Sequence, residues 1–394
     1  MYAVVTRQDA MSVPQRTVWQ VIQSADPELG GTSKAVVEIA GRLSKRGVRT
    51  VLLARCGNDR LRADRETWSM LTAAGVFIGP NQDEVSMSQS LRRHITAGDI
   101  VHIHGVWEPC LWRAASLSRR RGVPYIVCPH GMLDRWSLKR SRFKKRLAML
   151  AGARTMLARA SAIQCLTDKD LADTASLNLP AKLIRISNGV EVPERFASRE
   201  DVFTLFPGVL QGKRIVLFLA RIHPKKGLDL LIEAMRLMGK SHPDCVLVVA
   251  GAVEDRAYEA RCRALAKPLL NRVFWTGHVS GDRKRALLSA AALFVLPSFQ
   301  EGFSLSILEA LSMGTPVVIS HQCSFPEVSQ VGAGVIVGTV PADIAEAMSQ
   351  MLFKGPEALQ AAGLRGKQLV ERDFTWDRVI DRLLLTYRQL GALV

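Results

Sequence analysis

Residues 214–238 read RIVLFLARIHPKKGLDLLIEAMRLM, and this stretch decides the fold of the chain. Its first part, Arg214–Leu219, is a short apolar run that is typical of a buried strand. A basic loop follows, and Gly227–Met238 then has the periodicity of an amphipathic helix. A strand followed at once by a helix, when it is repeated, indicates a parallel sheet with helices on both faces.

The same alternation runs through both halves of the sequence. The clearest helix of the first half is expected at Ser33–Arg46, with Gly47 in a C-cap position. The pattern is that of the α/β class, so we expect two doubly wound, Rossmann-like domains that face each other across a cleft. The other expected strands are Val18–Gln23, Thr50–Leu53, Ile100–Ile103, Tyr125–Cys128, Ala162–Leu166, Val246–Ala250, Val273–Thr276, Leu293–Leu296, Pro316–Ile319 and Gly334–Ile336. The other expected helices are Ala257–Leu265, Arg283–Ser289, Ser304–Ser312 and Pro341–Met351.

Length and composition support two globular domains. A chain of 394 residues is too long for one ordinary core, and 48% apolar with 23% charged residues is typical of folded proteins. We place the boundary near Asn188–Pro193, where turn residues replace periodicity, which gives domains at residues 1–190 and 191–372. Residues 1–16 have no clear role.

The sequence contains no 18-residue apolar span and no secretory signal, so no membrane-crossing helix is expected. The seven cysteines show no C-x-x-C pair. We therefore expect reduced thiols, a cytoplasmic location and no cysteine-based zinc site.

The positive charge is concentrated in the first half of the chain. Residues 1–190 contain 29 Lys and Arg against 15 Asp and Glu, whereas residues 191–394 contain 24 against 21. The densest stretch, RWSLKRSRFKKR at residues 135–146, has apolar positions roughly compatible with one helical stripe. A solvated helix face, a surface for anionic lipid and a nucleic-acid site are all compatible with it, the last without a supporting motif. Its cations are Arg135, Lys139, Arg140, Arg142, Lys144, Lys145 and Arg146.

Two carboxylates, Glu301 and Glu309, enclose seven residues where a loop leads into a helix. Backbone N–H groups at such a helix start suit phosphate oxygens, and carboxylates accept bonds from sugar hydroxyls. Two alternatives stay open. Ser306 and Glu309 fit a capping box, and hydrolases also use a carboxylate pair.

Basic and small residues follow other predicted strands. Arg221 and Lys226 lie between a strand and a helix, where two cations suit a diphosphate, although a solvated loop has the same pattern. His223 in this loop fits a surface position equally well. Gly30 and Gly31 precede a helix and would let a ligand approach the backbone, or they form a plain turn.

Histidines end two predicted strands of the first half. His102 and His104 lie on one face of a strand and would suit zinc, but the sequence shows no third ligand nearby. A histidine at a strand end is also placed to bond a substrate hydroxyl or phosphate. His130 is the stronger candidate for that role, because Gly131 lets the chain turn sharply after it.

Taken in order, these motifs resemble those of the retaining glycosyltransferases of family 4, which have the GT-B fold. The resemblance spans roughly residues 17 to 385. Asp99–Trp107 and Pro129–Trp136 look like a bacterial branch that builds surface polysaccharides. The chain differs in having Glu191 where Asp is commoner and Ser306 where Pro is frequent. The elements that carry the resemblance are Gly30-Gly31, Pro129-His130-Gly131, Asn188-Gly189-Val190, Arg221 with Lys226-Gly227, and Glu301 with Glu309.

The resemblance implies a role for each matching residue. Glu301 would bind the donor sugar, Glu309 would bind the ribose, and Arg221 and Lys226 would neutralise the leaving diphosphate. His130 would lie beside the transferred sugar. Residues 373–394, with a helix around Trp376–Leu390, would pack back on the first domain. The other donor-binding positions would be Gly31, Gly277, Gly302, Phe303, Ser304 and Leu305.

The function implied is a retaining, metal-independent transfer of sugar from a UDP- or GDP-sugar to a lipid-linked glycan, in exopolysaccharide, O-antigen or capsule synthesis. The nucleotide sugar is a substrate, and no cofactor, metal or nucleic acid is expected. The basic first domain would lie on the anionic inner face of the cytoplasmic membrane. The alternatives are a sugar-nucleotide epimerase or hydrolase on the same fold and a non-enzymatic nucleic-acid-binding protein.

Overall fold

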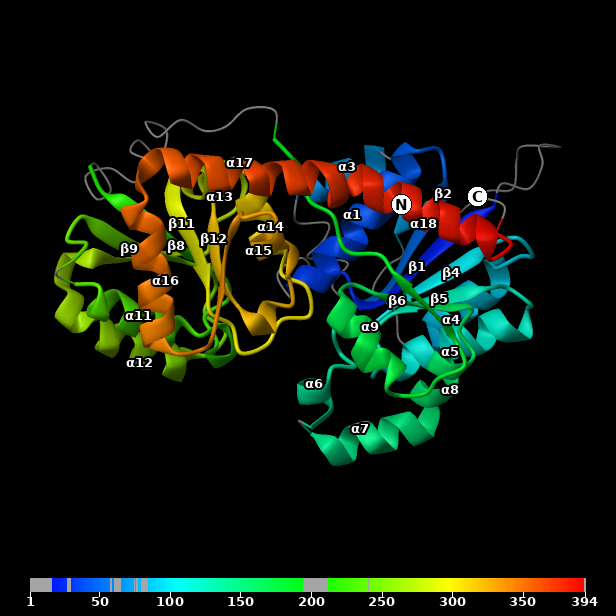
Figure 1. Cartoon of the computed structure of the whole chain (residues 1–394). Helices are drawn as coiled ribbons and strands as arrows, with labels where there is room; N and C mark the ends of the chain where they lie inside the picture. Colours follow the sequence, from blue (N-terminus) through cyan, green and yellow to red (C-terminus); the bar gives the residue numbers. More distant parts are fainter. Residues whose placement is uncertain are drawn as a thin grey trace.

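The computed structural model describes residues 16–26, 30–56, 59, 65–73, 75, 77–78, 84–139, 141–193, 212–239 and 241–392. They form two α/β lobes side by side, each built around one parallel sheet (Figure 1). The α/β class and the GT-B arrangement predicted from the sequence are confirmed.

The first lobe contains a seven-stranded sheet with the order β3-β2-β1-β4-β5-β6-β7. The order reverses between β1 and β4, which is the switch point where ligands of such sheets bind. The strands are β1 (Thr17–Ser24), β2 (Arg49–Cys56), β3 (Phe77–Ile78), β4 (Ile100–His104), β5 (Tyr125–Cys128), β6 (Ala162–Cys165) and β7 (Lys182–Arg185). The helical segments are α1 (Gly31–Lys45), α3 (Arg65–Ala73), α4 (Glu84–His94), α5 (Pro109–Arg120), α6 (Arg135–Lys139), α7 (Arg142–Ala148), the π-helical Met149–Ala153, α8 (Arg154–Ala158) and α9 (Asp168–Ala175).

The second lobe contains a six-stranded sheet with the order β10-β9-β8-β11-β12-β13. Its strands are β8 (Arg214–Leu219), β9 (Cys245–Ala250), β10 (Val273–Gly277), β11 (Ala291–Leu296), β12 (Val317–Ser320) and β13 (Gly334–Val337). Its α-helices are α11 (Leu228–Leu237), α12 (Arg256–Ala266), α13 (Gly281–Ala290), α14 (Leu305–Ser312), α15 (Glu327–Gln330), α16 (Pro341–Phe353) and α17 (Gly355–Asp373), and shorter turns lie at Pro224–Lys226, Lys267–Arg272 and His321–Cys323.

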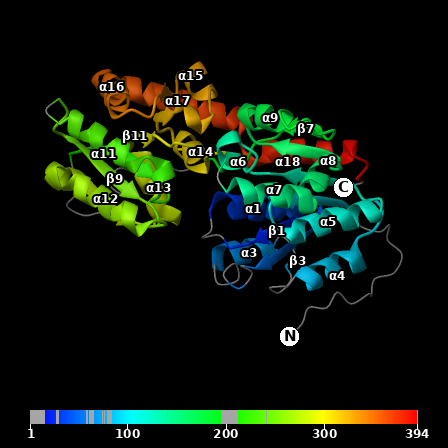
Figure 2. The same ribbon diagram turned by 90° about the horizontal axis from the view of Figure 1, so that it is seen from below.

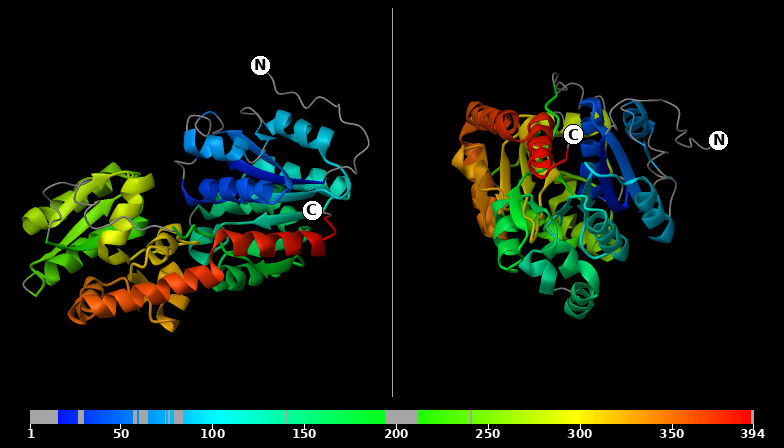
Figure 3. Two further views of the ribbon diagram at one scale, coloured as in Figure 1. Left: turned by 90° about the horizontal axis from the view of Figure 1, so that it is seen from above. Right: turned by 90° about the vertical axis from the view of Figure 1, so that its right-hand side faces the viewer.

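Alternating residues of the first sheet supply the cores on its two faces. Trp19 and Val101 face α4, α5 and α8, whereas their neighbours Val18 and Ile100 face α1 and the last helix, α18 (Trp376–Gln389). This follows from the period of two along a strand. Seen from above and from the side, α18 runs along the first lobe although it ends the chain (Figure 3).

The two lobes are linked where the chain crosses between them in both directions. Val190 N–H donates to the carbonyl of Phe374, and Trp376 N–H donates to the carbonyl of Val190. A Cβ at Gly189 would lie 2.7 Å from the ring of Trp376, so only glycine fits there. Residues 194–211 lie outside the described part, and the domain limits 190, 191, 372 and 373 stay predictions.

Two predictions for the first lobe were incomplete. The short edge strands β3 and β7 were not predicted. The basic stretch is not one helical stripe, because α6 and α7 are separate helices and Ser141 between them has a left-handed φ of 55°. Figure 2 shows α7 on the surface of the first lobe. Arg140 and most of residues 1–16 lie outside the described residues.

Candidate functional site

The candidate site lies where the two lobes touch at the carboxyl ends of their strands. The contact is between backbones, because a Cβ on Gly131 would lie 2.6 Å from Cα of Gly302. Likewise, a Cβ on Gly302 would lie 3.1 Å from the carbonyl oxygen of His130. A second contact is the hydrogen bond from the Gln300 amide to the carboxylate of Asp134, which is itself buried. Gly302 therefore lies directly against the His130–Gly131 turn.

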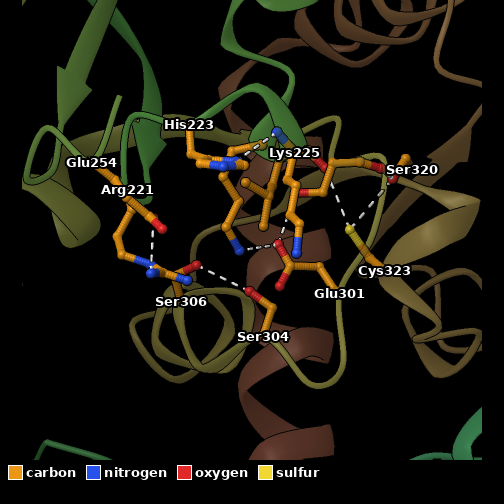
Figure 4. A network of polar contacts seen from close by, with 12 residues as sticks. Arg221, His223, Lys225, Glu254, Glu301, Ser304, Ser306, Ser320 and Cys323 are labelled. Carbon is orange, nitrogen blue, oxygen red and sulfur yellow. Dashed lines mark hydrogen bonds and ion pairs between the residues drawn. The ribbon is translucent and has the colours of Figure 1, made fainter. Parts of the chain in front are cut away.

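Glu301, which Figure 4 labels, forms the central ion pair of the site with Lys226. Lys226 Nζ lies 2.6 Å from Glu301 Oε1, and their side chains are only 16% and 7% exposed. Ser298 donates a second hydrogen bond to the same oxygen at 2.7 Å. Below the pair, burial and then the charge of Glu301 raise the pKa of Cys323 to about 12, so this thiol stays protonated.

The helix after Glu301 presents its first turn to the site. Helix α14 starts at Leu305, with Ser304 as N-cap, and no side chain caps its N–H groups. Ser304 Oγ instead lies 3.1 Å from Ser306 Oγ. The capping box expected from Ser306 and Glu309 is therefore wrong, because Ser306 is already inside the helix. Free N–H groups at a helix start are suited to an anion.

The side chain of Phe303 in this loop takes part in packing. Its ring packs near Phe325 and Phe374, with centroids 6.3 Å and 6.4 Å away. The side chain therefore anchors the loop to the core of the second lobe. Only its backbone is left to serve a ligand, which is the role that the sequence resemblance implies.

Glu309 carries a partner that the sequence analysis missed. Lys284 Nζ, on α13, lies 2.7 Å from Glu309 Oε1, and both side chains are about one quarter exposed. Lys284 is 25 residues away, so no local spacing pairs the two. A ribose diol at Glu309 would compete with Lys284 or share the carboxylate with it.

Arg221 reaches across to the glycines of the first lobe. Its guanidinium pairs with Glu254 at 2.8 Å and also lies 3.8 Å from the Cβ position of Gly30. Gly30 has a φ of 116°, a conformation that favours glycine. Gly31 faces Leu305, whose methyl lies 3.6 Å from its Cβ position. These contacts bring Arg221, the two glycines and the start of α14 together.

His130 occupies a turn that few residues other than glycine adopt. Its φ is 51° and that of Gly131 is 74°, so two consecutive residues are left-handed. Its ring is held from below by His104, with 3.0 Å between His130 Nε2 and His104 Nδ1. The strain of such a backbone is typical of functional positions.

Other predicted residues lie at the edges of the site. Gly277 is exposed, with a φ of 70° and nothing within 4 Å of its Cβ position. His223 is not a free surface group, since its Nδ1 accepts a hydrogen bond from the backbone N–H of Lys225 (Figure 4). It therefore caps the turn that carries Lys226.

The sequence predicted no metal site, but the structure brings three possible metal ligands together. Cys128 and His130 join His104 so that their ligand atoms all lie within 4.8 Å, although the sequence had shown no third ligand for the His102/His104 pair. Two further carboxylates that could bind a metal are those of the D-x-D tripeptide Asp168–Asp170. Its carboxylates are engaged, since Asp168 pairs with Arg185 at 2.7 Å and Asp170 accepts from Leu166 N–H.

The basic segment exposes apolar side chains beside its cations. On α7 and the turn after it, Phe143, Leu147 and Leu150 are 79%, 67% and 83% exposed. Arg142, Lys144 and Arg146 are also exposed.

Other cations of this segment are held by neighbouring groups. Lys145 folds back to Ser137 and lies over the ring of Trp107, and Arg135 pairs with Asp173 at 3.4 Å. Lys139 ends α6, and its side chain is not described. The surface-exposed face of α7 is therefore both apolar and basic.

Comparisons with known proteins agree for both lobes. Residues 206–368 match the family model of the glycosyl transferases group 1, and residues 30–189 match the glycosyl transferase 4-like domain. The chain is 27% identical over 335 residues to the GDP-mannose:cellobiosyl-diphosphopolyprenol alpha-mannosyltransferase of Xanthomonas oryzae, covering 81% of this chain and 83% of that one. It is 24% identical over 398 residues to a D-inositol 3-phosphate glycosyltransferase of Segniliparus rotundus, covering 93% and 86%.

Solved structures share the whole architecture. The Anabaena protein HepE in complex with UDP superposes with a TM-score of 0.77 at 17% identity, covering 95% of this chain and 100% of that one. Sucrose-phosphate synthase of Thermosynechococcus elongatus superposes with a TM-score of 0.72 at 17% identity, covering 96% and 100%. At this identity the likeness concerns the fold.

Proposed function

Because this chain is a group 1 glycosyltransferase with the GT-B fold, we propose that it transfers a sugar, with retention, from a UDP- or GDP-sugar to a lipid-linked glycan. The proposed setting is the synthesis of a bacterial surface polysaccharide. The reaction would need no metal or cofactor. HepE is described with UDP and the Xanthomonas relative is named for GDP-mannose and a diphosphopolyprenol acceptor, which is why these substrate classes are favoured.

The observation that carries this proposal is the buried pair of Lys226 and Glu301 beside the uncapped start of α14. The departing diphosphate gains negative charge while the anomeric carbon becomes oxocarbenium-like. Lys226 and Arg221 would stabilise the diphosphate, and the N–H groups of α14 add to that field. Glu301, held by Lys226 and Ser298, would accept bonds from hydroxyls of the transferred sugar.

Helix α7 supports the part of the proposal in which the protein binds a membrane surface and a lipid-linked acceptor. Phe143, Leu147 and Leu150 have the i, i+4, i+7 spacing of one helix face, and exposed cations flank them. Each Lys or Arg near an anionic bilayer contributes roughly 1 kcal/mol, and exposed apolar rings and chains insert at the interface. Among the described residues no helix is long and apolar enough to span a bilayer. The proposed partner of α7 is therefore an anionic lipid surface.

A thermal-shift screen of UDP-, GDP- and ADP-sugars tests the donor class. A donor at 100 times its dissociation constant adds about 2.7 kcal/mol of stability, which is easily measured. We expect stabilisation by one UDP- or GDP-sugar and slow turnover without acceptor. Rapid acceptor-independent consumption of the donor would instead indicate the hydrolase or epimerase alternative. Salt-sensitive binding of duplex DNA without nucleotide-sugar binding would contradict the whole proposal.

Vesicle sedimentation tests the lipid surface. We expect binding to vesicles with anionic lipid, weaker binding to neutral vesicles, and loss of binding in the Phe143→Ser/Leu147→Ser/Leu150→Ser variant. Phe353→Ser is the matched control, because Phe353 is 71% exposed on α16 of the other lobe. Equal binding of wild type to both vesicle types would contradict the role of charge.

A further inference from the structure

A network of five buried or half-buried side chains runs beneath His130, and we call it the histidine network: Gln20, His102, His104, His130 and Tyr387. Gln20 lies on β1, His102 and His104 lie on β4, and Tyr387 lies on α18. Gln20 Oε1 is 2.6 Å from His104 Nε2, and His104 Nδ1 is 3.0 Å from His130 Nε2. Both ring nitrogens of His104 are therefore engaged.

The engaged nitrogens give the bonds a direction. The carbonyl oxygen of Gln20 can only accept, so His104 Nε2 carries the hydrogen. A neutral imidazole has one hydrogen, so His104 Nδ1 is an acceptor and His130 Nε2 must donate to it. His130 then has no hydrogen on Nδ1. Among the residues that the structure describes, none is recorded as bonding that nitrogen.

The other end of the network supports the orientation of the Gln20 amide. Burial raises the pKa of the Tyr387 phenol and the Gln20 amide, as a donor, opposes that rise, but the buried Gln20 Nε2 has no hydrogen-bond partner of normal geometry among the described residues. Tyr387 is completely buried and its hydroxyl lies 2.8 Å from His102 Nδ1. Turning the amide round would place its NH2 against His104 and its oxygen against Tyr387.

All three imidazoles are kept neutral by their surroundings. Burial lowers the pKa of His102 to about 3 and of His130 to about 4, and it lowers the pKa of His104 well below its usual value. The rings of His102 and His104 stack with centroids 4.2 Å apart, so two charged rings there would repel each other. A neutral network with one hydrogen per ring accounts for the contacts of His104 with Gln20 and His130, whereas Gln20 Nε2 and His102 Nε2 have no partner among the described residues.

We propose that Gln20 and His104 are positioning residues that hold His130 as the neutral tautomer protonated on Nε2, so that Nδ1 presents a lone pair. In the cleft that lone pair would accept a hydrogen bond from a hydroxyl of the donor sugar. The tautomer itself does not depend on the donor. Its use by a sugar hydroxyl rests on the proposed function.

The competing interpretation is a metal site, since the sulfur of Cys128 also lies within 4.8 Å of the His104 and His130 nitrogens. A metal ion between the rings would replace the hydrogen that His130 gives to His104. Burial raises the pKa of the Cys128 thiol well above its usual value, so the metal would also have to remove a reluctant proton. The two interpretations differ in whether the His130–His104 hydrogen exists.

The first experiment reads the tautomers without any substrate. We would label the full-length protein with 15N-histidine and record two- and three-bond 1H–15N spectra of the metal-free protein near pH 7. The expected spectrum gives His130 and His104 as Nε2–H tautomers. In Gln20→Leu we expect signals of both His130 tautomers, because His104 is released. An Nδ1–H tautomer of His130 in the wild type would overturn the proposal.

Two control variants distinguish an effect on the direction of the hydrogen bonds from an effect on the packing of the core. Gln164→Leu removes another fully buried glutamine of the same sheet, which donates to Ile186, acts on the pKa of His102 and bonds neither His104 nor His130. It should leave the His130 tautomer unchanged. Gln20→Glu keeps an acceptor at the same place and should restore the single tautomer that Gln20→Leu loses. A zinc addition that shifts the ring 15N signals of both histidines and saturates at one equivalent would support the metal and overturn the proposal.

The second experiment connects the tautomer with turnover. With UDP-glucose, UDP-galactose and GDP-mannose as probes, Gln20→Leu should lower kcat about tenfold on the donor that is used, with KM within twofold, because one hydrogen bond to the reacting sugar is weakened. Gln20→Glu should recover most of that loss. If the NMR result holds but no probe is turned over, the proposed function fails and the tautomer assignment stands. Unchanged kcat in a variant with mixed tautomers would overturn the role in the cleft.

Discussion

The Lys226–Glu301 pair sets the electrostatics of the site at the scale of single residues. Both side chains are mostly buried, so each charge depends on the other for compensation. A bound diphosphate would draw Lys226 toward a second anion, while Ser298 continues to hold Glu301. In the proposed reaction, the cation would therefore already be in place before the leaving group develops its charge.

Replacing Lys226 with Ala should lower kcat by about 10²- to 10³-fold, as expected for the loss of one preorganised electrostatic donor. The substitution also leaves Glu301 unpaired in a site where it is 7% exposed. We therefore expect a lower melting temperature as well. Steady-state kinetics with a saturating donor, together with thermal unfolding, measure the two effects separately.

Lys367→Ala is the matched control for this prediction. Lys367 pairs with Glu371 within α17, at 3.7 Å and away from the cleft. The Lys367 and Glu371 side chains are 23% and 48% exposed, so this longer and more exposed pair should stabilise the protein less than the Lys226–Glu301 pair, and its loss should leave kcat unchanged. A Lys226→Ala enzyme with wild-type kcat would contradict the role given to Lys226.

The sequence predicted which residues lie together at the candidate site better than it predicted their partners. Glu301, Lys226 and His130 stand at the ends of predicted strands, where parallel topology brings them to one edge. Lys284 beside Glu309 and Asp134 beside Gln300 could not be predicted. Their pairing depends on how separate helices and lobes pack, and no spacing along the chain records that.

At the scale of elements, α18 completes the first lobe from the far end of the chain. Trp376, Val379, Ile380, Leu383 and Tyr387 are buried against α1 and the first sheet. Salt bridges from Arg46 to Asp377 and Asp381 lie on the rim of this contact. The apolar stripe of α18 contributes most of the attachment, because exposed ion pairs contribute little.

Replacing Leu383 with Ala should therefore destabilise the protein by about 2–5 kcal/mol through the cavity it leaves. Leu383 has no exposed surface, whereas Leu385 on the same helix is 56% exposed. Leu385→Ala should cost much less and serves as the control. Urea unfolding followed by circular dichroism measures both, and equal effects in the two variants would argue against α18 as part of the core.

Buried helices and strands were predicted more accurately than exposed ones. Strand β8 is apolar and buried from Ile215 to Leu219, and its limits were predicted correctly, since continuous apolar runs are typical of strands in parallel sheets. The edge strand β7 reads KLIR and has partly or fully exposed residues only, so its pattern is weak. The break between α6 and α7 depends on the left-handed Ser141, which no propensity indicates.

At the scale of the whole molecule, the buried histidines make stability depend on pH. Their pKa values are lowered in the folded protein, to about 3 for His102 and about 4 for His130, and lie near 6.5 when unfolded. The unfolded chain therefore binds more protons below that value. The stability they provide is complete above pH ~6.5 and is lost as the pH falls toward the folded values.

Between pH 6 and 4 each such histidine should remove up to about 1.4 kcal/mol per pH unit from the free energy of unfolding. Asp170 acts in the opposite direction, because burial raises its pKa to about 6 and its protonation then favours the folded state. We expect a net loss, measured by urea unfolding at several pH values. A flat profile in the wild type would contradict the prediction.

The return of α18 to the first sheet also has a consequence for synthesis on the ribosome. The apolar face formed by Val18, Ile39, Leu43 and Ile100 is covered by a helix that ends at Gln389, five residues before the last. At 5–20 residues per second, roughly 10 to 40 seconds pass between translation of β7 and of α18. During that interval the nascent first lobe exposes a surface that chaperones recognise. A premature stop after α17 would leave that surface exposed permanently, however well the second lobe folds.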